Sequence, residues 1–278
     1  MICCQERDQR PHVGWRALFQ HCMWTVSGYV AFWLLGFRVK ILGQQASREE
    51  ARILIVAPHS SFMDVFTIAL CYASPVARIE NSKTWFLWAP QAIGHTIFVD
   101  RYKTLIIDNS QSYLYIILFS IIDCILNILL TRKSPESREE AKSDILKRAS
   151  SSLAWPQLFI FSEGTTTNGK YLARFRAGGF RPGLPVQPVT IKYGRSDLCV
   201  WTKLQSHRLI HSLLLIFANP LNEVTLEFLS VYQPSEQEQA DPVLFAENVQ
   251  KLMGNHLNIP ATDFQREELN LDLIKKQE

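Results

Sequence analysis

The 278-residue sequence lacks several short motifs that define common enzyme and metal-binding classes. It contains no G-x-S-x-G nucleophile elbow, no HExxH pair, no P-loop and no EF-hand pattern. The sequence therefore lacks the core residues of serine hydrolases, zincins and P-loop nucleotidases. Its six cysteines include no CxxC pair and no spacing typical of a disulfide framework. We therefore expect free or buried thiols in a reducing compartment rather than structural disulfides.

Long basic runs are also absent: 29 Lys and Arg residues against 26 Asp and Glu give a net charge of +3 and a pI near 8.5. Nucleic-acid-binding domains carry a basic patch or stripe, so we expect no nucleic-acid partner. Hydrophobic residues, in contrast, make up 47% of the chain, with seven Trp and sixteen Phe. Because Trp and Tyr favour the membrane–water interface, we expect the lipid bilayer to be a partner.

An apolar segment near the N-terminus, residues 17–37, contains no Asp, Glu, Lys or Arg and is flanked by Arg16 and Arg38. As a helix it would be about 30 Å long, close to the thickness of the hydrocarbon core of a bilayer. Its internal polar residues weaken a spanning helix, so a re-entrant or in-plane anchor is an equal alternative and a buried soluble helix a third. We predict an N-terminal tail and membrane-anchoring helical segment over residues 1–42.

Strand-like and helix-like patterns alternate in the rest of the chain. Strands are predicted within 36–59, 74–101, 157–165, 174–193 and 224–232. Helices are predicted after residue 59, within 74–101 between two strands, over 134–156 and from Asp241 onward. Such alternation is typical of an α/β fold with a parallel or mixed sheet. We therefore predict a single mixed-sheet α/β domain over residues 43–265, followed by a charged tail over 266–278.

The stretch PHSSFMD, residues 58–64, follows the apolar run ILIVAP. A strand followed by Ser60 or Ser61 as a helix N-cap places His59 in a tight strand-to-helix turn. Asp64 then lies about one helical turn further on, where it can accept a hydrogen bond from the imidazole. An oriented, neutral histidine of this kind can take a proton from an alcohol. The spacing alone is common by chance, so it needs support from other parts of the chain.

Two other predicted strands also end in polar residues: TIFV is followed by Asp100 and Arg101, and LFIFS is followed by Glu163 and Gly164. Groups at strand ends are the usual components of sites in α/β sheets. A base, a cation for an anionic substrate and flexible backbone suit acyl transfer from a thioester to an alcohol on a phosphate-bearing lipid.

Four motifs in order resemble those of the glycerolipid acyltransferase family, most closely its lysophosphatidylcholine acyltransferase branch. They are the H-x4-D pair within 58–64, FVDR (98–101), FSEGT (161–165) and LPVQPV (184–189). The resemblance covers about residues 36–101 and 134–265. Ser162 departs from the family's usual proline, which is expected to loosen a turn without removing a reacting group.

The resemblance implies a single acyltransferase domain in which His59 is the general base on a lysophospholipid hydroxyl and Asp64 orients its imidazole. Acyl-CoA is the co-substrate, and neither a cofactor nor a metal is expected. Arg101 would hold the lipid phosphate, and Glu163, with Gly164 and Thr165, would shape the acceptor site. An ion pair between Glu163 and Arg101 is the alternative for these two side chains.

Three functions remain open from the sequence. The first is acylation of a lysophosphatidylcholine-like acceptor in phospholipid synthesis or remodelling. The second is acylation of lysophosphatidic acid or glycerol-3-phosphate, and the third is a catalytically inactive membrane-associated homologue. A dilysine near the end of the chain, Lys275 and Lys276, resembles a retrieval signal, so we expect the endoplasmic reticulum membrane with the site on its cytosolic face.

Residues 102–133 form an atypical apolar insertion between the second motif and the helix predicted over 134–156. They are either a membrane-binding insertion or sequence from a retained intron or gene-model error, and the second explanation is favoured. A full membrane span here would separate Glu163 from His59. If the insertion is genuine, we therefore expect it to pack outside the core or to lie in the membrane interface.

Overall fold

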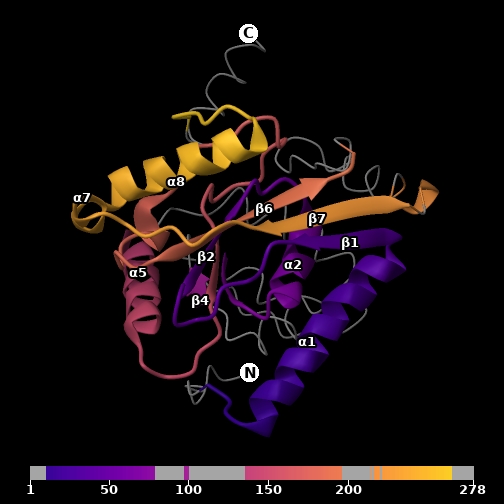
Figure 1. Ribbon diagram of the computed structural model, residues 1–278, viewed down its shortest axis with the longest axis horizontal. Helices are drawn as coiled ribbons and strands as arrows, with labels where there is room; N and C mark the ends of the chain where they lie inside the picture. Colours follow the sequence, from indigo (N-terminus) through magenta and orange to yellow (C-terminus); the bar gives the residue numbers. More distant parts are fainter. Residues whose placement is uncertain are drawn as a thin grey trace, which may run out of the picture.

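In the described part of the chain, a seven-stranded mixed sheet forms the centre of the protein (Figure 1). The computed structural model describes residues 11–78, 97–99, 135–195, 214, 216–219 and 221–264. The strands lie in the order β1-β7-β6-β2-β5-β3-β4, where β6 and β7 pair antiparallel and the other neighbours pair parallel. Their bounds are β1 Phe37–Leu42, β2 Ile53–Ala57, β3 Ser74–Arg78, β4 Ile97–Val99, β5 Leu158–Phe161, β6 Val186–Tyr193 and β7 Asn222–Phe228. The predicted mixed α/β sheet is confirmed.

Helices cover both faces of this sheet. The helical elements are α1 Trp15–Leu34, η1 Phe62–Asp64, α2 Val65–Leu70, α5 Pro135–Ser150, η3 Ala177–Gly179, α7 Glu236–Ala240 and α8 Pro242–Leu257. Alternate side chains of the fully buried strand β2 enter two hydrophobic clusters. Leu54 and Val56 pack toward α1 and α2, whereas Ile53 and Ile55 pack toward α5 and α8. A strand buried on both faces is typical of the centre of a parallel sheet.

The local signals at the start of α8 act as predicted. Asp241 accepts hydrogen bonds from the backbone N–H groups of Val243 and Leu244, and Pro242 takes the first helical position. Phe245 and Val249 on the inner face are buried in the cluster beneath the sheet. This helix closes the face of the sheet opposite α1 (Figure 1).

Helix α1 confirms the helical part of the N-terminal prediction. It packs on α2 through Gly28, where a Cβ would lie 3.1 Å from the Ala69 Cβ atom, so glycine permits a close approach of the two helices. Among the described residues, no helix has the length and apolar content needed to cross a bilayer. Residues 37–42, assigned to the N-terminal segment above, form edge strand β1 and belong to the sheet, because they pair in parallel with β7.

Other predicted elements are confirmed with shifted ends. The helix expected over 134–156 is α5, Pro135–Ser150, and the late strand expected over 224–232 is β7, which ends at Phe228. The helix predicted within 74–101, the insertion at 102–133 and the tail at 266–278 lie outside the described residues.

Candidate active site

The first motif forms a turn between the buried strand β2 and helix α2. Ser61, one of the two predicted caps, starts the short helix η1: its side chain accepts a hydrogen bond from the Met63 backbone N–H. A capping box joins Ser61 to Asp64, whose carboxylate returns to the backbone N–H of the cap. The capping box therefore turns Asp64 back toward His59 through local contacts.

His59 and Asp64 form the hydrogen bond that the sequence predicts. The distance from the His59 Nδ1 atom to the Asp64 Oδ2 atom is 2.7 Å, and the aspartate is completely buried. The same oxygen accepts from the backbone N–H groups of Ser60 at 3.0 Å and Ser61 at 3.1 Å, and the other oxygen accepts from the Tyr193 hydroxyl at 2.5 Å. An ionised carboxylate only accepts hydrogen bonds, so these four donors fit the charged form.

The imidazole of His59 is fixed on two sides. Its ring stacks on that of Phe161, the last residue of β5, with ring centroids 4.1 Å apart and planes 21° from parallel. The side chain remains 23% exposed, in contrast to its partner Asp64. Because Nδ1 is bonded to the carboxylate, Nε2 is the nitrogen that can exchange a proton with a substrate. This geometry is compatible with general-base chemistry, in which a carboxylate orients the ring and stabilises the imidazolium.

Glu163 joins the third motif to the first. Its Oε2 atom accepts a 2.6 Å hydrogen bond from the His59 backbone N–H, and its Oε1 atom accepts from the Ala173 backbone N–H at 3.0 Å. The His59 carbonyl in turn accepts from the Thr167 backbone N–H at 2.7 Å. Burial, opposed by these hydrogen bonds and assisted by the charge of Asp64, raises the pKa of Glu163 to about 8. Its carboxyl group thus holds the turn that carries the histidine.

Gly164 occupies the left-handed region of backbone space, with φ of +62°. This conformation favours glycine, and a Cβ here would lie 2.5 Å from the Nε atom of Arg176, so that side chain would have to move. Thr165 follows at a partly exposed position. Arg101, the predicted phosphate ligand, lies outside the described residues. The alternative prediction of an ion pair between Arg101 and Glu163 is therefore not tested by the structure.

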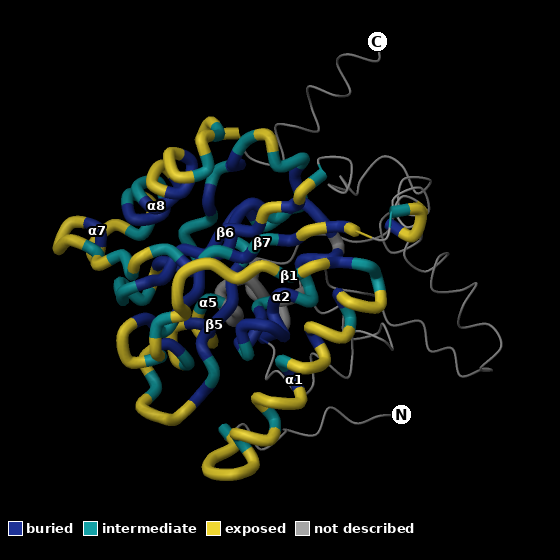
Figure 2. Tube along the Cα trace, turned by 45° about the vertical axis from the view of Figure 1, so that its right-hand side comes forward, coloured by how far each residue is buried: buried dark blue, intermediate teal, exposed yellow. Residues whose placement is uncertain are grey.

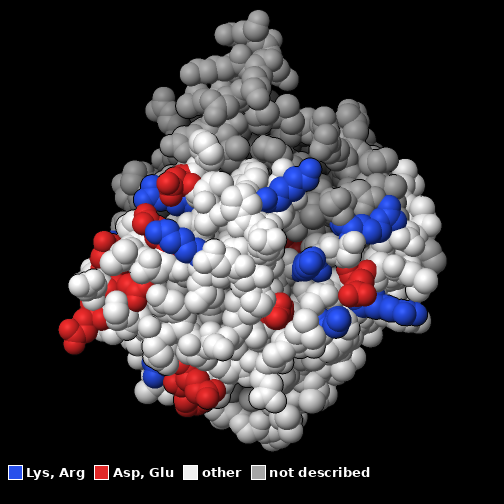
Figure 3. All heavy atoms as spheres, turned by 45° about the horizontal axis from the view of Figure 1, so that its top comes forward, with Lys and Arg blue, Asp and Glu red and all other residues white. Residues whose placement is uncertain are grey.

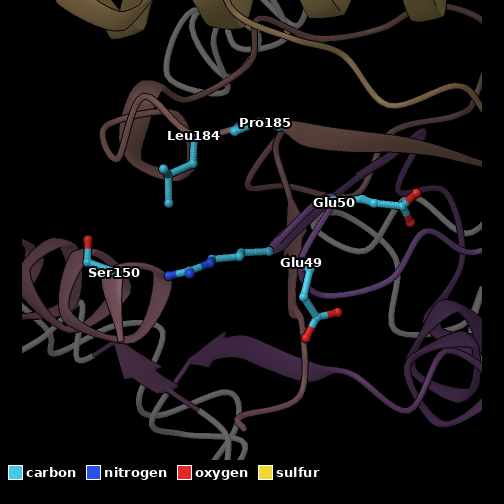
Figure 4. A pocket seen from close by; sticks show the side chains of 6 residues that line it. Glu49, Glu50, Ser150, Leu184 and Pro185 are labelled. Carbon is cyan, nitrogen blue, oxygen red and sulfur yellow. The ribbon is translucent and has the colours of Figure 1, made fainter. Parts of the chain in front are cut away.

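Two hollows lie at the opposite end of the strands from His59. One, of about 340 Å³, includes Arg52 and Ser150 in its wall (Figure 4). Arg52 immediately precedes β2, and its guanidinium donates to the carbonyls of Ala149 and Ser151 at the end of α5. The other hollow, of about 520 Å³, is lined mainly by the start of α1 and the segment before β5. Arg52 thus satisfies carbonyl groups at the C-terminal end of α5, and its place in the wall of the first hollow has a structural explanation.

The positions and charges of the described residues bear on two further features, a cluster of metal ligands and a basic patch. Within the described residues, no group of three or more His, Cys, Asp or Glu side chains is arranged to hold a metal ion. On the face shown in Figure 3, described basic and acidic side chains are interspersed rather than gathered by sign.

The motifs, the sheet and the histidine–aspartate pair together define an acyltransferase domain. Residues 38–192 match the profile of the Acyltransferase family, so this chain belongs to the acyltransferase family. The fold is similar to that of the crystal structure of the 1-acyl-sn-glycerophosphate (LPA) acyltransferase PlsC from Thermotoga maritima. That similarity has a TM-score of 0.51 at 16% identity and covers 86% of this chain and 79% of that one.

Among curated proteins, the chain is similar to lysophosphatidylcholine acyltransferase 2 of Rattus norvegicus, with 34% identity over 272 residues. It is 36% identical over 262 residues to lysophospholipid acyltransferase LPCAT4 of Mus musculus. These alignments cover 97% and 93% of this chain and 44% of each relative. The chain thus spans less than half the length of these relatives, and the resemblance to the lysophosphatidylcholine acyltransferase branch is confirmed.

Proposed function

We propose that this chain is an acyl-CoA-dependent acyltransferase that acylates the free hydroxyl of a lysophospholipid, lysophosphatidylcholine or a close analogue, in phospholipid synthesis or remodelling. The observation that carries the proposal is the His59–Asp64 hydrogen bond, buried on the aspartate side and exposed on the histidine side, at the carboxyl end of β2. The names of the curated relatives support the acceptor class.

In the proposed reaction the Nε2 atom of His59 takes the proton of the lysophospholipid hydroxyl as its oxygen attacks the thioester carbonyl of acyl-CoA. The new C–O bond gives a tetrahedral intermediate, which collapses as the C–S bond breaks. The leaving CoA thiolate takes the proton from the imidazolium, so the base is regenerated. Asp64 balances the positive charge of the imidazolium while it exists. General-base assistance of this kind is worth roughly 10²–10⁴ in rate.

The remaining predicted site residues have three proposed roles. Arg101 would bind the lipid phosphate through charge-assisted hydrogen bonds. Gly164 and Thr165 lie in the turn after β5, next to the segment that carries His59, and are proposed to shape the acceptor site. Glu163 is proposed to act there mainly through the backbone, since both of its oxygens already accept backbone hydrogen bonds.

The catalytic assignment is tested with microsomes that contain equal amounts of the wild-type chain or the His59→Ala variant. Each preparation receives radiolabelled acyl-CoA and a panel that includes lysophosphatidylcholine, lysophosphatidic acid and glycerol-3-phosphate. We expect incorporation above background in the wild type alone, with lysophosphatidylcholine preferred. Equal incorporation by the two preparations would reject the enzyme and favour the inactive homologue, and a preference for glycerol-3-phosphate or lysophosphatidic acid would replace the acceptor.

We further propose that the outer face of α1 lies in the membrane interface, where the lipid substrate is. Large apolar side chains at helical spacing are exposed along this face, which Figure 2 shows at the edge of the molecule. They are Trp15, Leu18, Phe19, Met23, Val26, Val30 and Trp33. An in-plane helix with aromatic residues near both ends is typical of interfacial anchors. The proposed location is the endoplasmic reticulum membrane, with the site on the cytosolic side.

Cosedimentation with phosphatidylcholine vesicles tests this orientation. Phe19→Glu and Trp33→Glu each place a charge on the outer face of α1, and we expect each to reduce the vesicle-bound fraction severalfold. Val243→Glu is the control, because Val243 is 43% exposed on α8, at the opposite side of the sheet. If all three variants bind vesicles as the wild type does, α1 is not the element in contact with lipid.

A further inference from the structure

Tyr193, the last residue of β6, contacts the Asp64 side of the histidine–aspartate pair. Its hydroxyl donates to the Oδ1 atom of Asp64 at 2.5 Å across 129 residues of sequence. The Oδ2 atom of the same carboxylate takes the three hydrogen bonds from residues 59–61. The two oxygens therefore have different partners: one is bonded to the local turn and the other to a distant strand.

The tyrosine ring is itself held in place. It is buried, and it packs edge-on against Phe37 at the start of β1, with ring centroids 6.0 Å apart. Phe37 in turn packs edge-on against Phe32 of α1, with centroids 5.7 Å apart. A hydroxyl on a ring fixed by aromatic neighbours offers a donor whose direction is set before substrate arrives.

We propose that Tyr193 is a positioning residue for catalysis: it fixes the plane and the charge of the Asp64 carboxylate, and through it the basicity and direction of His59. This inference rests on the proposed function, since it assigns a role in the same site. Tyr193 itself is not proposed to touch substrate.

The direction of the effect follows from the burial of Asp64. Without the tyrosine hydroxyl, the Oδ1 atom would carry negative charge in a place without contact with water, which disfavours the charged carboxylate. The Asp64 carboxylate would then favour the positively charged imidazolium of His59 more strongly, because that charge would compensate a less stabilised anion. The pair would keep its proton to higher pH, and less of the active, unprotonated base would be present near neutrality. Asp64 and Glu163 are the described carboxyl groups that contact the His59 residue.

The test compares Tyr193→Phe with Tyr232→Phe in the full chain. Tyr232 is a matched control, because its hydroxyl also donates to a glutamate, Glu238, at 2.6 Å, in a part of the protein away from His59. We expect Tyr193→Phe to lower kcat/KM at pH 7 about tenfold, the effect of one hydrogen bond to a charged group, with an unchanged KM for acyl-CoA. The acid limb of its pH profile should move upward by about half a pH unit or more. Tyr232→Phe should leave the profile in place.

A second measurement does not depend on turnover. The His59 imidazole signal, identified by its loss in His59→Ala, is titrated by NMR in the wild type, in Tyr193→Phe and in a protein with 3-fluorotyrosine at position 193. The more acidic fluorinated phenol keeps the hydroxyl and donates more strongly, so its midpoint should move downward, opposite to that of Tyr193→Phe. Midpoints that do not move in either direction overturn the proposal. If acyl transfer is absent in the wild type while the midpoints move as expected, the proposed activity fails and the positioning role stands.

Discussion

Two regions of this protein contain a carboxylate bonded to a tyrosine hydroxyl, and they differ in what else the carboxylate holds. Asp64 accepts from Tyr193, from two backbone N–H groups and from the partly exposed imidazole of His59. Glu238 accepts from Tyr232, from the side chain of Asn248 and from the Ser235 cap of α7. Both carboxylates are well satisfied, so hydrogen bonding alone does not identify a functional site.

The difference lies in which partner remains available to solvent. The partners of Glu238 tie α7 to α8 and to the segment after β7, and none of them is a base that exchanges protons near neutral pH. Asp64 instead holds a histidine whose second nitrogen is free of the carboxylate, at the carboxyl end of a parallel strand. A structural network ends within the protein, whereas a catalytic network ends at a titratable group that substrate can reach.

The two regions should differ most in how the removal of the carboxylate charge, at Asp64 or at Glu238, affects kcat. We expect Asp64→Asn to lower kcat roughly 10²–10⁴-fold, because the amide can no longer stabilise the imidazolium. Glu238→Gln should leave kcat within about twofold of the wild type, the range expected for a substitution that touches no reacting group. Steady-state rates are normalised to folded protein measured by circular dichroism. Comparable losses of kcat in the two variants would show that the Asp64 network is only structural.

The turn after β5 offers a second and smaller contrast. Gly164→Ala forces an L side chain into φ of +62° and against Arg176, so we expect unfolding to require about 1–3 kcal/mol less free energy. Gly178→Ala in η3 is the control, because a Cβ there meets nothing within 4 Å, and it should change stability by less than about 0.5 kcal/mol. Urea unfolding measures both. Equal stabilities of the two variants would mean that Arg176 and the backbone adapt to the added methyl group.

Local signals in the sequence predict much of this fold. The apolar run before His59, the Ser61 cap, and Asp241 with Pro242 each act within a few residues, and each appears in the structure as expected. The capping box of α7, in which Ser235 is followed three residues later by Glu238, is a signal of the same local kind. The order of the strands was not readable, because the pairing of β1 with β7 joins residues about 185 positions apart.

The candidate site also combines local contacts, which the sequence predicts, with contacts between distant parts of the chain, which it does not predict. The His59–Asp64 hydrogen bond is local and was predicted, whereas the Tyr193 hydroxyl reaches Asp64 from a strand that no spacing rule connects to the first motif. The sequence also indicated Glu163 as part of the acceptor site. Only the fold shows that its carboxyl group accepts hydrogen bonds from two backbone N–H groups, those of His59 and Ala173. Motifs indicate which residues matter, while contacts across the sheet show how they act.

A further contrast concerns the pH dependence of stability, because the pKa shifts of Glu163 and Glu238 have opposite signs. The pKa of Glu163 is raised from 4.5 to about 8, chiefly by burial. Burial also raises the pKa of Glu238, but hydrogen bonds from Tyr232, Asn248 and Ser235 outweigh it and lower the value to about 2. Between about pH 4.5 and 8 the folded protein therefore binds more protons at Glu163 than the unfolded chain, and its free energy of unfolding falls as pH rises.

The Glu163→Gln variant lacks this titration but keeps an acceptor for the His59 backbone. We expect its Tm to rise relative to that of the wild type by several degrees between pH 5 and pH 8, with the change complete above the raised pKa of Glu163. The contribution of Glu238 is lost only as pH falls below about 4.5 toward 2, so Glu238→Gln should differ from the wild type by a constant amount over the same range. Thermal melts of the three proteins at matched ionic strength measure both differences. If the curve of Glu163→Gln ran parallel to that of the wild type, Glu163 would titrate alike in the folded and unfolded states, and the raised pKa of its buried carboxyl would be wrong.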